Sequence, residues 1–416
     1  MTTPLRVAIT ARSVFPIHGM GGLERSVYDL ARHLAGNGHI VTLITRTPQS
    51  PVSPDVVHPN VRLAFVPYRT FPFAGRRGTT VLDRSTAYPL FGLRAGAHAA
   101  AMVARGEVDI VHGFGASVLG YARRRLSLPA PLVLNPQGLE EFGATDPSRA
   151  RLKRAAYLPL RRAVIACARR ADAVIATDHA LVPAVRQHLG IPDAKIVTIP
   201  NALDLDDVDA MAGPADGARL RLESGIADDE MVLLSVGRLE ENKGFHLLAQ
   251  ALAGLREHSG RLAHGRWRWV IVGAGPFRER LEALIGELRL TEHVMFAGRS
   301  PDRELHAWYE AADLFIHPTL YEGSSLVTLE AMAHRRPCVV TDAGGLPDKV
   351  KNGINGWIVP AGDPAALAAA ISGALEDRGR LAQMGDVGRT IVDLDFSWKS
   401  AALETIRLYR RLLGQP

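Results

Sequence analysis

Short apolar runs alternate with segments of helical periodicity through the first half of the chain. Residues 5–10 form an apolar run rich in β-forming residues, and the apolar residues within 23–34 recur at helical spacing. Strands that alternate with helices in this way predict a parallel sheet covered by helices. The expected strands of this half are residues 5–10, 40–45, 108–112, 132–135, 173–177 and 196–199.

A second α/β series starts at residue 231. Its apolar runs are again short, and helical segments separate them. The last helical run, residues 397–413, has no strand after it. The expected strands of this half are residues 231–236, 269–272, 294–296, 314–317, 337–341 and 357–359.

The two series predict two doubly wound, Rossmann-like α/β domains that face each other across a cleft, where such sheets bind ligands. We expect an N-terminal domain of residues 1–203 and a C-terminal domain of residues 204–396, with a final helix of about residues 397–416 packing back on the first domain. Residues 201–217, rich in Asp, Ala and Gly, are the expected hinge. Residues 69–94 mix Arg, Pro, Gly and aromatics without a period and are expected to be loops.

Composition restricts the class of protein. The chain has 416 residues, 47% of them hydrophobic and 22% charged, which is typical of a soluble globular protein. No stretch approaches the ~18 uninterrupted apolar residues of a membrane-spanning helix. The N-terminus has no signal-peptide pattern, so we expect no export. The only cysteines, Cys167 and Cys338, exclude a disulfide framework and fit a reducing cytoplasm.

The charge is unevenly distributed. Residues 1–200 hold 25 Lys and Arg against 12 Asp and Glu, whereas residues 201–416 hold 24 against 31. The basic half predicts an anionic neighbour. Residues 147–171 contain eight Lys and Arg and no acid, which favours either a docking surface for anionic lipid or a solvated helix face packed on the first domain. We expect a solvated helix face and no insertion of the helix into a membrane. We find no nucleic-acid-binding motif.

The loop at residues 235–244, SVGRLEENKG, follows an expected strand and precedes an expected helix. Gly237 lets the backbone approach a ligand. Arg238 and Lys243 together suit a diphosphate, although two ordinary surface cations on a solvated turn would look the same. The loop containing Gly275, at residues 273–276, gives a weaker signal.

Residues 321–332 carry the strongest local pattern. A helix should begin near Ser324 or Ser325, both good capping residues, and its N-terminal N–H groups favour phosphate. Glu322 would then lie in the loop above the strand, and Glu330 further along the helix. Each carboxylate could accept hydrogen bonds from a sugar hydroxyl. The alternative is a capping-region Glu322 and an ion-paired Glu330.

Together these elements resemble the retaining glycosyltransferase family 4, which has the GT-B fold. The matching segments occur in family order over nearly the whole chain, and the ordered set is far more specific than any one of them. The segments are GMGGLER at 19–25, DIVH at 109–112, IPNALD at 199–204, SVGRLEENKG at 235–244, VGAGP at 272–276, FAGRS at 296–300, EGSSLVTLE at 322–330 and GGLPD at 344–348.

The resemblance implies roles for individual residues. Arg238 and Lys243 should hold the donor diphosphate and stabilise the leaving nucleotide. Glu322 should contact hydroxyls of the transferred sugar, and with Arg238 and Lys243 it makes up the implied catalytic residues. Glu330 should bind the nucleotide ribose. The glycines at positions 21 and 22 should approach the reacting centre. Residues 298–300 should lie beside the base of the nucleotide. The backbone N–H groups at 323–325, where the helix begins, should face the donor sugar or phosphate. These further positions are Gly21, Gly22, Gly237, Gly275, Arg299, Gly323, Ser324, Ser325 and Leu326.

The chain departs from the family in places. Gln137 stands where a His is frequent, so an ionised role there is in doubt and donor choice could differ. Asp348 stands where Glu is common, and Ala202 where Gly is common; both changes are minor. Outside the motifs, His112 either lines the cleft or is a structural histidine, and His317 is expected only to support its loop.

The predicted function is transfer of a sugar from a nucleotide-diphosphate donor to an acceptor hydroxyl, with retention of anomeric configuration as the family implies. No Asp-x-Asp metal motif is evident in the loops expected to hold the donor, and paired cations can replace a metal at the diphosphate, so we expect no metal and no cofactor beyond the donor substrate. A nucleotide-sugar epimerase and a non-catalytic sugar-nucleotide-binding scaffold of the same fold remain alternatives. A nicotinamide-dependent enzyme is disfavoured, because Arg278 replaces the third glycine of the fingerprint.

The expected acceptor is a sugar, a glycolipid or a lipid-linked molecule in cell-envelope polysaccharide or glycolipid assembly. We expect a cytoplasmic protein, with peripheral contact to an anionic membrane at its inner face as a further hypothesis. Nucleic acid is not an expected partner.

Overall fold

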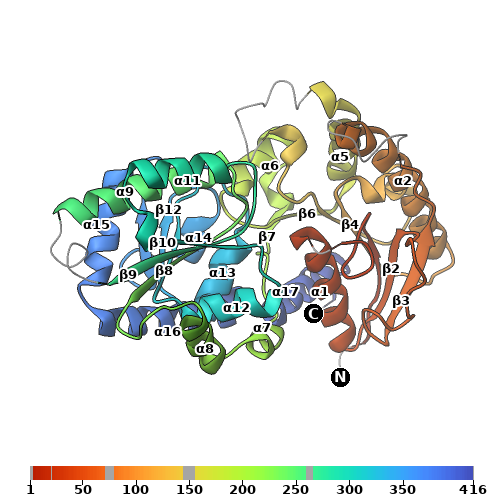
Figure 1. Cartoon of the computed structure of the whole chain (residues 1–416). Helices are drawn as coiled ribbons and strands as arrows, with labels where there is room; N and C mark the ends of the chain where they lie inside the picture. Colours follow the sequence, from red (N-terminus) through yellow and green to blue (C-terminus); the bar gives the residue numbers. More distant parts are fainter. Residues whose placement is uncertain (1–2, 20, 71–78, 144–154, 259–265, 416) are drawn as a thin grey trace. The chain divides into compact units, whose positions relative to one another are not determined.

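The computed structural model describes residues 3–19, 21–70, 79–143, 155–258 and 266–415 (Figure 1). The chain packs into two compact units. One unit joins Met1–Asn201 with Trp398–Pro416, and the other is Ala202–Ser397. No helix among the described residues has the length and apolar character needed to cross a bilayer.

The first unit is built on a parallel sheet with strand order β3-β2-β1-β4-β5-β6-β7. The register aligns Val7 with Val41 on one side and with Ile110 on the other, which places the apolar centres of the strands together. The described strands are β1 Arg6–Thr10, β2 Ile40–Arg46, β3 Val61–Val66, β4 Ile110–Phe114, β5 Leu132–Asn135, β6 Ala173–Ala176 and β7 Ile196–Thr198.

Helices cover both faces of this sheet. On one face α1 (Gly22–Gly36) packs against α17 (Trp398–Leu412), so the C-terminal helix belongs to the first unit. The other face buries a continuous apolar cluster under helices that lie between residues 79 and 189. These helices are α2 Thr79–Ala104, α3 Leu119–Ala122, α5 Leu158–Arg170 and α6 Leu181–Leu189, with the short 3₁₀ segment η1 Gly115–Val118.

The second unit repeats the plan with strand order β10-β9-β8-β11-β12-β13, again all parallel. Its four central strands are almost wholly buried, as expected when helices cover both faces, whereas the edge strand β10 is half-buried throughout. The described strands are β8 Met231–Val236, β9 Trp267–Val272, β10 Val294–Gly298, β11 Leu314–His317, β12 Cys338–Thr341 and β13 Gly356–Val359.

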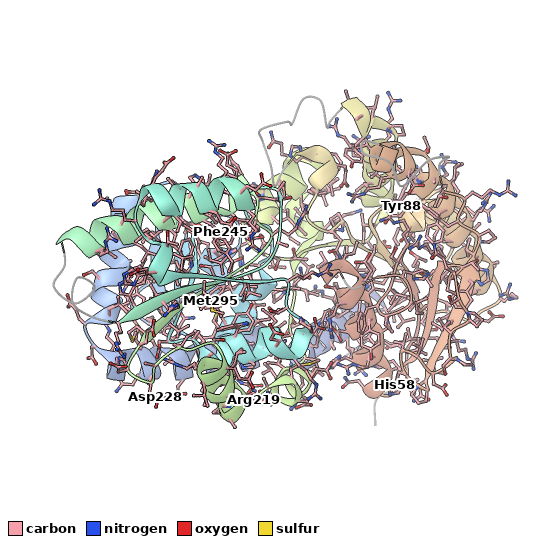
Figure 2. All side chains as sticks on the ribbon, viewed as in Figure 1. His58, Tyr88, Arg219, Asp228, Phe245 and Met295 are labelled. Carbon is pink, nitrogen blue, oxygen red and sulfur yellow. The ribbon has the colours of Figure 1, made fainter. Side chains whose placement is uncertain are left out.

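Two apolar clusters flank this sheet. Phe245, labelled in Figure 2, is fully buried in the cluster on one face. Helices α9 Phe245–His258, α11 Arg278–Glu287 and α15 Pro364–Leu375 cover that face in Figure 1. The opposite cluster lies under α7 Leu205–Met211, α8 Pro214–Glu223, α12 Asp302–Ala311, α13 Leu326–Ala333, α14 Leu346–Lys349 and α16 Arg378–Asp395.

Both sheets are therefore doubly wound, and the predicted α/β fold class is confirmed. In each sheet the strand order reverses once, between β1 and β4 in the first and between β8 and β11 in the second. Ligands of such sheets bind beyond the carboxyl ends of the strands at this switch point. The expected strands are found with small boundary shifts, the largest at 108–112, where β4 covers Ile110–Phe114.

Strand β3 was not predicted. It lies at the edge of its sheet, and its burial alternates rather than running continuously. Arg62 and Phe65 are both exposed, so the segment has no uninterrupted apolar run. An edge strand with a half-exposed face gives the weaker sequence signal seen here.

The prediction of loops at residues 69–94 was wrong for the described part. Residues 79–94 begin the 26-residue helix α2, and residues 71–78 lie outside the described residues. Pro89 and Gly92 suggested a break in the pattern. Gly92 instead permits close helix packing, because a Cβ there would lie 1.9 Å from the carbonyl oxygen of Ala116.

The expected hinge at residues 201–217 is mostly helical. It contains α7 and the start of α8, and the Asp204 carboxylate caps α7 by accepting hydrogen bonds from the N–H groups of Asp206 and Asp207. A Cβ at Gly217 would lie 2.6 Å from the carbonyl carbon of Glu310, so this glycine serves packing against α12. The Asp- and Gly-rich composition therefore reflects capping and close contact.

The basic stretch at residues 147–171 is only partly described, because residues 147–154 lie outside the described residues. Its remainder forms α5, which buries Leu160, Val164 and Cys167 in the first unit. Arg162, Arg169 and Arg170 are exposed, so the described part is a helix face packed on the unit with its cations in solvent.

Replacing Gly92 with Ala tests the close packing of α2. The new methyl group would clash with the Ala116 carbonyl, which should cost about 1–3 kcal/mol even after the better helix propensity of Ala is included. Scanning calorimetry should show a lower melting temperature. The matched control is Gly36→Ala at the end of α1, where nothing lies within 4 Å and stability should hold or rise slightly. Equal melting temperatures for Gly92→Ala and the unmodified chain would contradict this account.

Candidate functional site

The predicted motif residues of the second unit gather at the carboxyl edge of its sheet, at the switch point. Strand β8 ends at Val236 and leads directly into Gly237, and the neighbouring β11 ends at His317. The loops after these two strands carry Lys243 and Glu322. The topology therefore brings together residues that are far apart in the sequence.

Glu322 lies at the centre of a partly buried ionic cluster. Lys243 Nζ and His317 Nε2 lie 2.8 Å and 2.7 Å from its Oε2 atom, and the N–H of Gly323 donates to Oε1 at 3.1 Å. Burial by itself would raise the pKa of Glu322, but the hydrogen bond and charge of His317 and the charge of Lys243 lower it to about 2. Glu322 is therefore ionised at neutral pH and acts only as a hydrogen-bond acceptor.

Close backbone contacts fix the loops that carry this cluster. Gly244 ends the 3₁₀ turn η6 Glu241–Lys243 with φ +71°, and a Cβ there would lie 1.9 Å from the carbonyl oxygen of Pro318. The N–H of Leu320 also donates to the carbonyl of Asn242 at 2.8 Å. Lys243 is thereby held beside the loop that carries Glu322.

Arg238 is placed differently from Lys243. Its side chain is 76% exposed and pairs with Glu240 at 2.7 Å. The loop itself is ordered against the next one, because the N–H of Leu239 donates to the carbonyl of Ala274 at 3.1 Å and a Cβ on Gly275 would lie 2.2 Å from the Leu239 carbonyl oxygen. Gly237 and Gly275 thus lie in adjoining loops, while the Arg238 guanidinium projects into solvent.

Helix α13 begins where the sequence predicted. Ser325 is its N-cap residue and Leu326 its first residue, but the Ser325 hydroxyl bonds to that of Thr328 at 2.9 Å and does not cap a backbone N–H. The Ser324 hydroxyl is buried and has no partner among the described residues. Together with Gly323, these residues present a helix start with unused polar groups, which suits an anionic or hydroxylated ligand.

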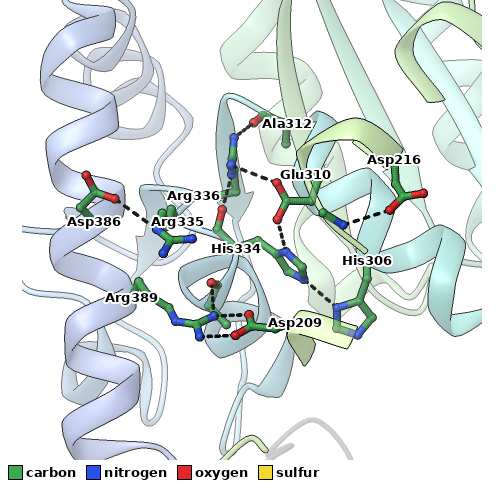
Figure 3. A network of polar contacts seen from close by, with 12 residues as sticks. Asp209, Asp216, His306, Glu310, Ala312, His334, Arg335, Arg336, Asp386 and Arg389 are labelled. Carbon is green, nitrogen blue, oxygen red and sulfur yellow. Dashed lines mark hydrogen bonds and ion pairs between the residues drawn. The ribbon is translucent and has the colours of Figure 1, made fainter. Parts of the chain in front are cut away.

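Glu330 lies on α13, one turn beyond Leu326. The hydroxyl of Tyr309 on α12 donates to its Oε2 atom at 2.8 Å. Beside Tyr309 is the polar network of Figure 3, in which His334 donates to Glu310 at 2.6 Å. Neither of the two roles considered for Glu330 in the sequence analysis included a hydrogen bond from a tyrosine.

Arg299 is exposed on the loop after β10. The carbonyl of Gly298 accepts a hydrogen bond from the N–H of Gly273 at 2.7 Å. Residues 298–300 therefore lie beside the loop that contains Gly275. The Ser300 hydroxyl donates to Glu304 at 2.7 Å and is not free.

In the first unit, the Gly-rich loop begins α1. Gly21 is the N-cap residue and Gly22 the first helical residue, and the Glu24 side chain folds back so closely that a Cβ on Gly21 would lie 2.5 Å from its Oε2 atom. Nearby, a pocket of about 380 Å³ opens at the carboxyl end of β2. Its lining includes His18 and Arg46.

Arg12 and Arg46 occupy this carboxyl edge without a carboxylate partner among the described residues. Their guanidinium groups lie over the rings of Tyr88 and Tyr68, at 5.1 Å and 5.7 Å from the ring centres. Burial lowers the pKa of Arg46 and the charge of Arg12 lowers it further, while the nearby Tyr68, Asp83 and Glu24 act in the opposite direction. The Nε atom of Arg46 is buried and has no hydrogen-bond partner in the described structure.

Three residues outside the predicted site have clear positions. Gln137 has a left-handed backbone with φ 62°, and its side-chain nitrogen is buried with no partner among the described residues. His112 is a structural histidine, whose Nδ1 lies 2.7 Å from the Tyr409 hydroxyl and whose pKa burial lowers to about 3. Cys167 is buried in the core, as predicted.

Two functional partners were missed by the sequence analysis. His317 was expected only to support its loop, yet it bonds directly to Glu322. Its place at the end of β11 offered a weak signal. Tyr309 lies inside a helix with no motif around it, so nothing in the sequence pointed to Glu330. In the described ranges no group of three or more His, Cys, Asp and Glu is arranged to hold a metal ion.

Comparisons with known proteins match both units. The family model of Glycosyltransferase Family 4 matches residues 20–207, and that of Glycosyl transferases group 1 matches residues 218–390. An uncharacterised glycosyltransferase of Methanocaldococcus jannaschii is 31% identical over 57% of this chain and 59% of that protein. A D-inositol 3-phosphate glycosyltransferase of Acidothermus cellulolyticus is 30% identical over 99% of this chain and 92% of that protein.

Solved structures share the fold over the full length. The sucrose-phosphate synthase of Thermosynechococcus elongatus has a TM-score of 0.74 at 24% identity, with 99% of each chain covered. The Anabaena protein HepE, solved in complex with UDP, has a TM-score of 0.71 at 21% identity, covering 98% of this chain and 100% of that one. With both units matched in order and a full-length relative at 30% identity, the chain belongs to glycosyltransferase family 4 and has the GT-B fold.

Proposed function

We propose that the protein is a retaining glycosyltransferase that moves a sugar from a nucleotide-diphosphate sugar to an acceptor hydroxyl without a metal ion. The observation that carries this proposal is the Glu322 cluster. An ionised carboxylate, a lysine ammonium and the start of α13 lie together at the switch point of the second sheet. That combination suits a ligand with both phosphate and hydroxyl groups.

The diphosphate would bind on the cationic side of this cluster. The Lys243 ammonium has three donors, of which Glu322 takes one, so two remain for phosphate oxygens. Arg238 could turn from Glu240 to the ligand, because an exposed ion pair contributes only about 0–1 kcal/mol. A fixed ammonium and a mobile guanidinium could neutralise the leaving diphosphate, which is the role a metal ion would otherwise have.

The sugar would bind on the Glu322 side. The carboxylate has about four acceptor positions. His317, Lys243 and Gly323 use three, which leaves room for one sugar hydroxyl. With a pKa of about 2, Glu322 is too weak a base to take the acceptor proton at neutral pH. In our proposal the departing phosphate oxygen takes that proton, and Glu330 binds the ribose hydroxyls of the donor.

The comparisons support this proposal at the level of donor class. HepE was solved with UDP, a nucleoside diphosphate of the kind proposed here. The relative from Acidothermus is named a glycosyltransferase, and it covers almost all of this chain. An epimerase or a binding scaffold would use the same donor site, so the acceptor reaction is the distinguishing test.

The proposed acceptor carries an anionic group, such as a sugar phosphate or a lipid-linked phosphate of cell-envelope assembly. Arg12 and Arg46 support this, because two neighbouring cations with no direct ion pair among the described residues would attract an anion at this edge of the sheet. The pocket lined by Arg46 and His18 is large enough for a phosphate and part of a sugar. Two of the similar proteins, the D-inositol 3-phosphate glycosyltransferase and the sucrose-phosphate synthase, are also named for a phosphorylated compound.

Donor binding tests the first part. Titration calorimetry with UDP-, GDP-, ADP- and dTDP-sugars should identify one donor that binds. Lys243→Ala and Glu330→Ala should each weaken it about 10- to 100-fold, because each removes a hydrogen bond to or from a charged group. The matched control is Arg266→Ala, which removes an exposed cation at the amino end of β9 and should leave affinity unchanged.

If no donor binds, or if both variants bind it as well as the unmodified protein, the proposed donor site is wrong. Transfer itself is followed by NMR of the product. An axial donor that yields an axial glycoside supports retention. Conversion of the sugar without any acceptor would favour the epimerase.

Acceptor recognition tests the second part. With the donor identified, Arg46→Gln should raise the KM for phosphorylated acceptors about 10-fold or more and change the KM for their unphosphorylated forms little. D-inositol 3-phosphate, sugar phosphates and their dephosphorylated counterparts form the panel. Arg62→Gln, an exposed cation at the amino end of β3, is the control. An equal effect of Arg46→Gln on both acceptor forms would exclude a phosphate contact.

A further inference from the structure

Helix α12 supplies the residue that fixes the carboxylate of Glu330. Tyr309 is fully buried, and its hydroxyl donates to Glu330 Oε2 at 2.8 Å. Burial raises the pKa of Tyr309 far above its usual value, and the neighbouring charge of Glu330 raises it further. The phenol therefore remains protonated and is a permanent hydrogen-bond donor to the carboxylate.

The ring of Tyr309 is itself held in place by aromatic neighbours. It stacks on His334 with ring centres 5.7 Å apart and planes at 7°, and it meets Phe315 of β11 at 5.9 Å. Such contacts restrict the orientation of the ring in a close-packed interior. The hydroxyl position is thus determined by packing and not by Glu330 alone.

A polar network fixes His334 in turn (Figure 3). Its Nδ1 donates to Glu310 at 2.6 Å, and its Nε2 lies 2.7 Å from Nδ1 of His306. Arg336 closes the network, since it lies 3.5 Å from Glu310 and donates to the Ala312 carbonyl at 2.7 Å. All of these groups lie on α12, on the end of α13 or just after them, so the network joins the two helices.

The two glutamates that we propose to bind the donor are oriented by different neighbours. Glu322 is oriented by three groups of its own cluster. The Glu330 carboxylate is contacted by the Tyr309 hydroxyl, which is in a position to orient it toward a ribose. A binding group performs best when neighbouring hydrogen bonds and packing hold its rotamer.

We propose that Tyr309 is a positioning residue that orients Glu330 toward the ribose hydroxyls of the donor, and so sets the preference for a ribonucleotide over its deoxy form. This inference rests on the proposed function, because it assumes that Glu330 binds the ribose. Tyr309 itself touches no ligand. Its effect is transmitted through the single hydrogen bond to the Glu330 carboxylate.

Tyr309→Phe tests the inference, since it removes only the hydroxyl. The probes are the nucleoside diphosphate that binds in the donor panel and its 2′,3′-dideoxy analogue, both measured by titration calorimetry. The unmodified protein should prefer the ribonucleotide by about 10-fold or more, as expected when a buried polar group loses its partner. In Tyr309→Phe the preference should fall to about 3-fold or less, while affinity for the dideoxy analogue should change less than about 2-fold.

A purely structural role for Tyr309 would give a different result. In that case Tyr309→Phe would lower the affinity for both nucleotides equally and would also lower the melting temperature. Trp308→Phe is the matched control, because Trp308 is buried beside Tyr309 on the same helix and makes no recorded contact with Glu330 among the described residues. It should lower the melting temperature and keep the preference for ribose. His334→Gln is a second probe, which removes the stacking partner and should reduce the preference in the same direction.

Glu330→Gln separates the two levels of the proposal. It should abolish the preference, and adding Tyr309→Phe to it should cause no further change. If Glu330→Gln keeps the full preference, the proposed ribose role of Glu330 is wrong. If Glu330→Gln loses the preference while Tyr309→Phe and His334→Gln retain it, the positioning role of Tyr309 is overturned and the proposed function stands.

Discussion

Direct contact of backbone with backbone holds the carboxyl edge of the second sheet together, and the candidate site depends on it. At Gly244 and Gly344 a Cβ would lie 1.9 Å from the carbonyl oxygens of Pro318 and Glu322 respectively. Both residues have positive φ values, so any other residue would be strained as well as crowded. These contacts leave the loops after β8, β11 and β12 little freedom. Lys243 and Glu322, 79 residues apart in sequence, are therefore 2.8 Å apart in space.

The ionic cluster formed in this way has an energetic cost and a functional use. Burial opposes the charge on Glu322, yet Lys243 and His317 hold its pKa near 2 against an ordinary value of 4.5. Because the folded pKa is the lower one, the stabilisation is fully present above about pH 4.5 and is lost as the pH falls towards 2. Over the neutral range the site is thus a fixed arrangement of charges. A fixed arrangement needs no reorganisation when a charged leaving group develops beside it.

Sequence reasoning succeeded where a single segment carried the information. Continuous apolar runs such as β8 and β11 were predicted to the residue, and the motif around Glu322 correctly placed the start of α13. It failed where tertiary contacts decide. Gly92 suggested a break in a helix, whereas in the structure it allows Ala116 to pack closely against α2. Strand β3 lacks an apolar run because one of its faces is exposed. In the same way, the roles of Tyr309 and His317 became clear only from their hydrogen bonds to Glu330 and Glu322 in the folded chain.

The two glutamates of the motif show why such partners matter. Eight residues separate them in sequence, and one carboxylate lies in a loop while the other lies on α13. Glu322 is held by two cationic or potentially cationic groups, which keep it ionised. Glu330 is held by a neutral phenol whose ring is packed against His334 and Phe315. The phenol thus fixes the direction of the Glu330 carboxylate, which can still accept further hydrogen bonds from hydroxyl groups.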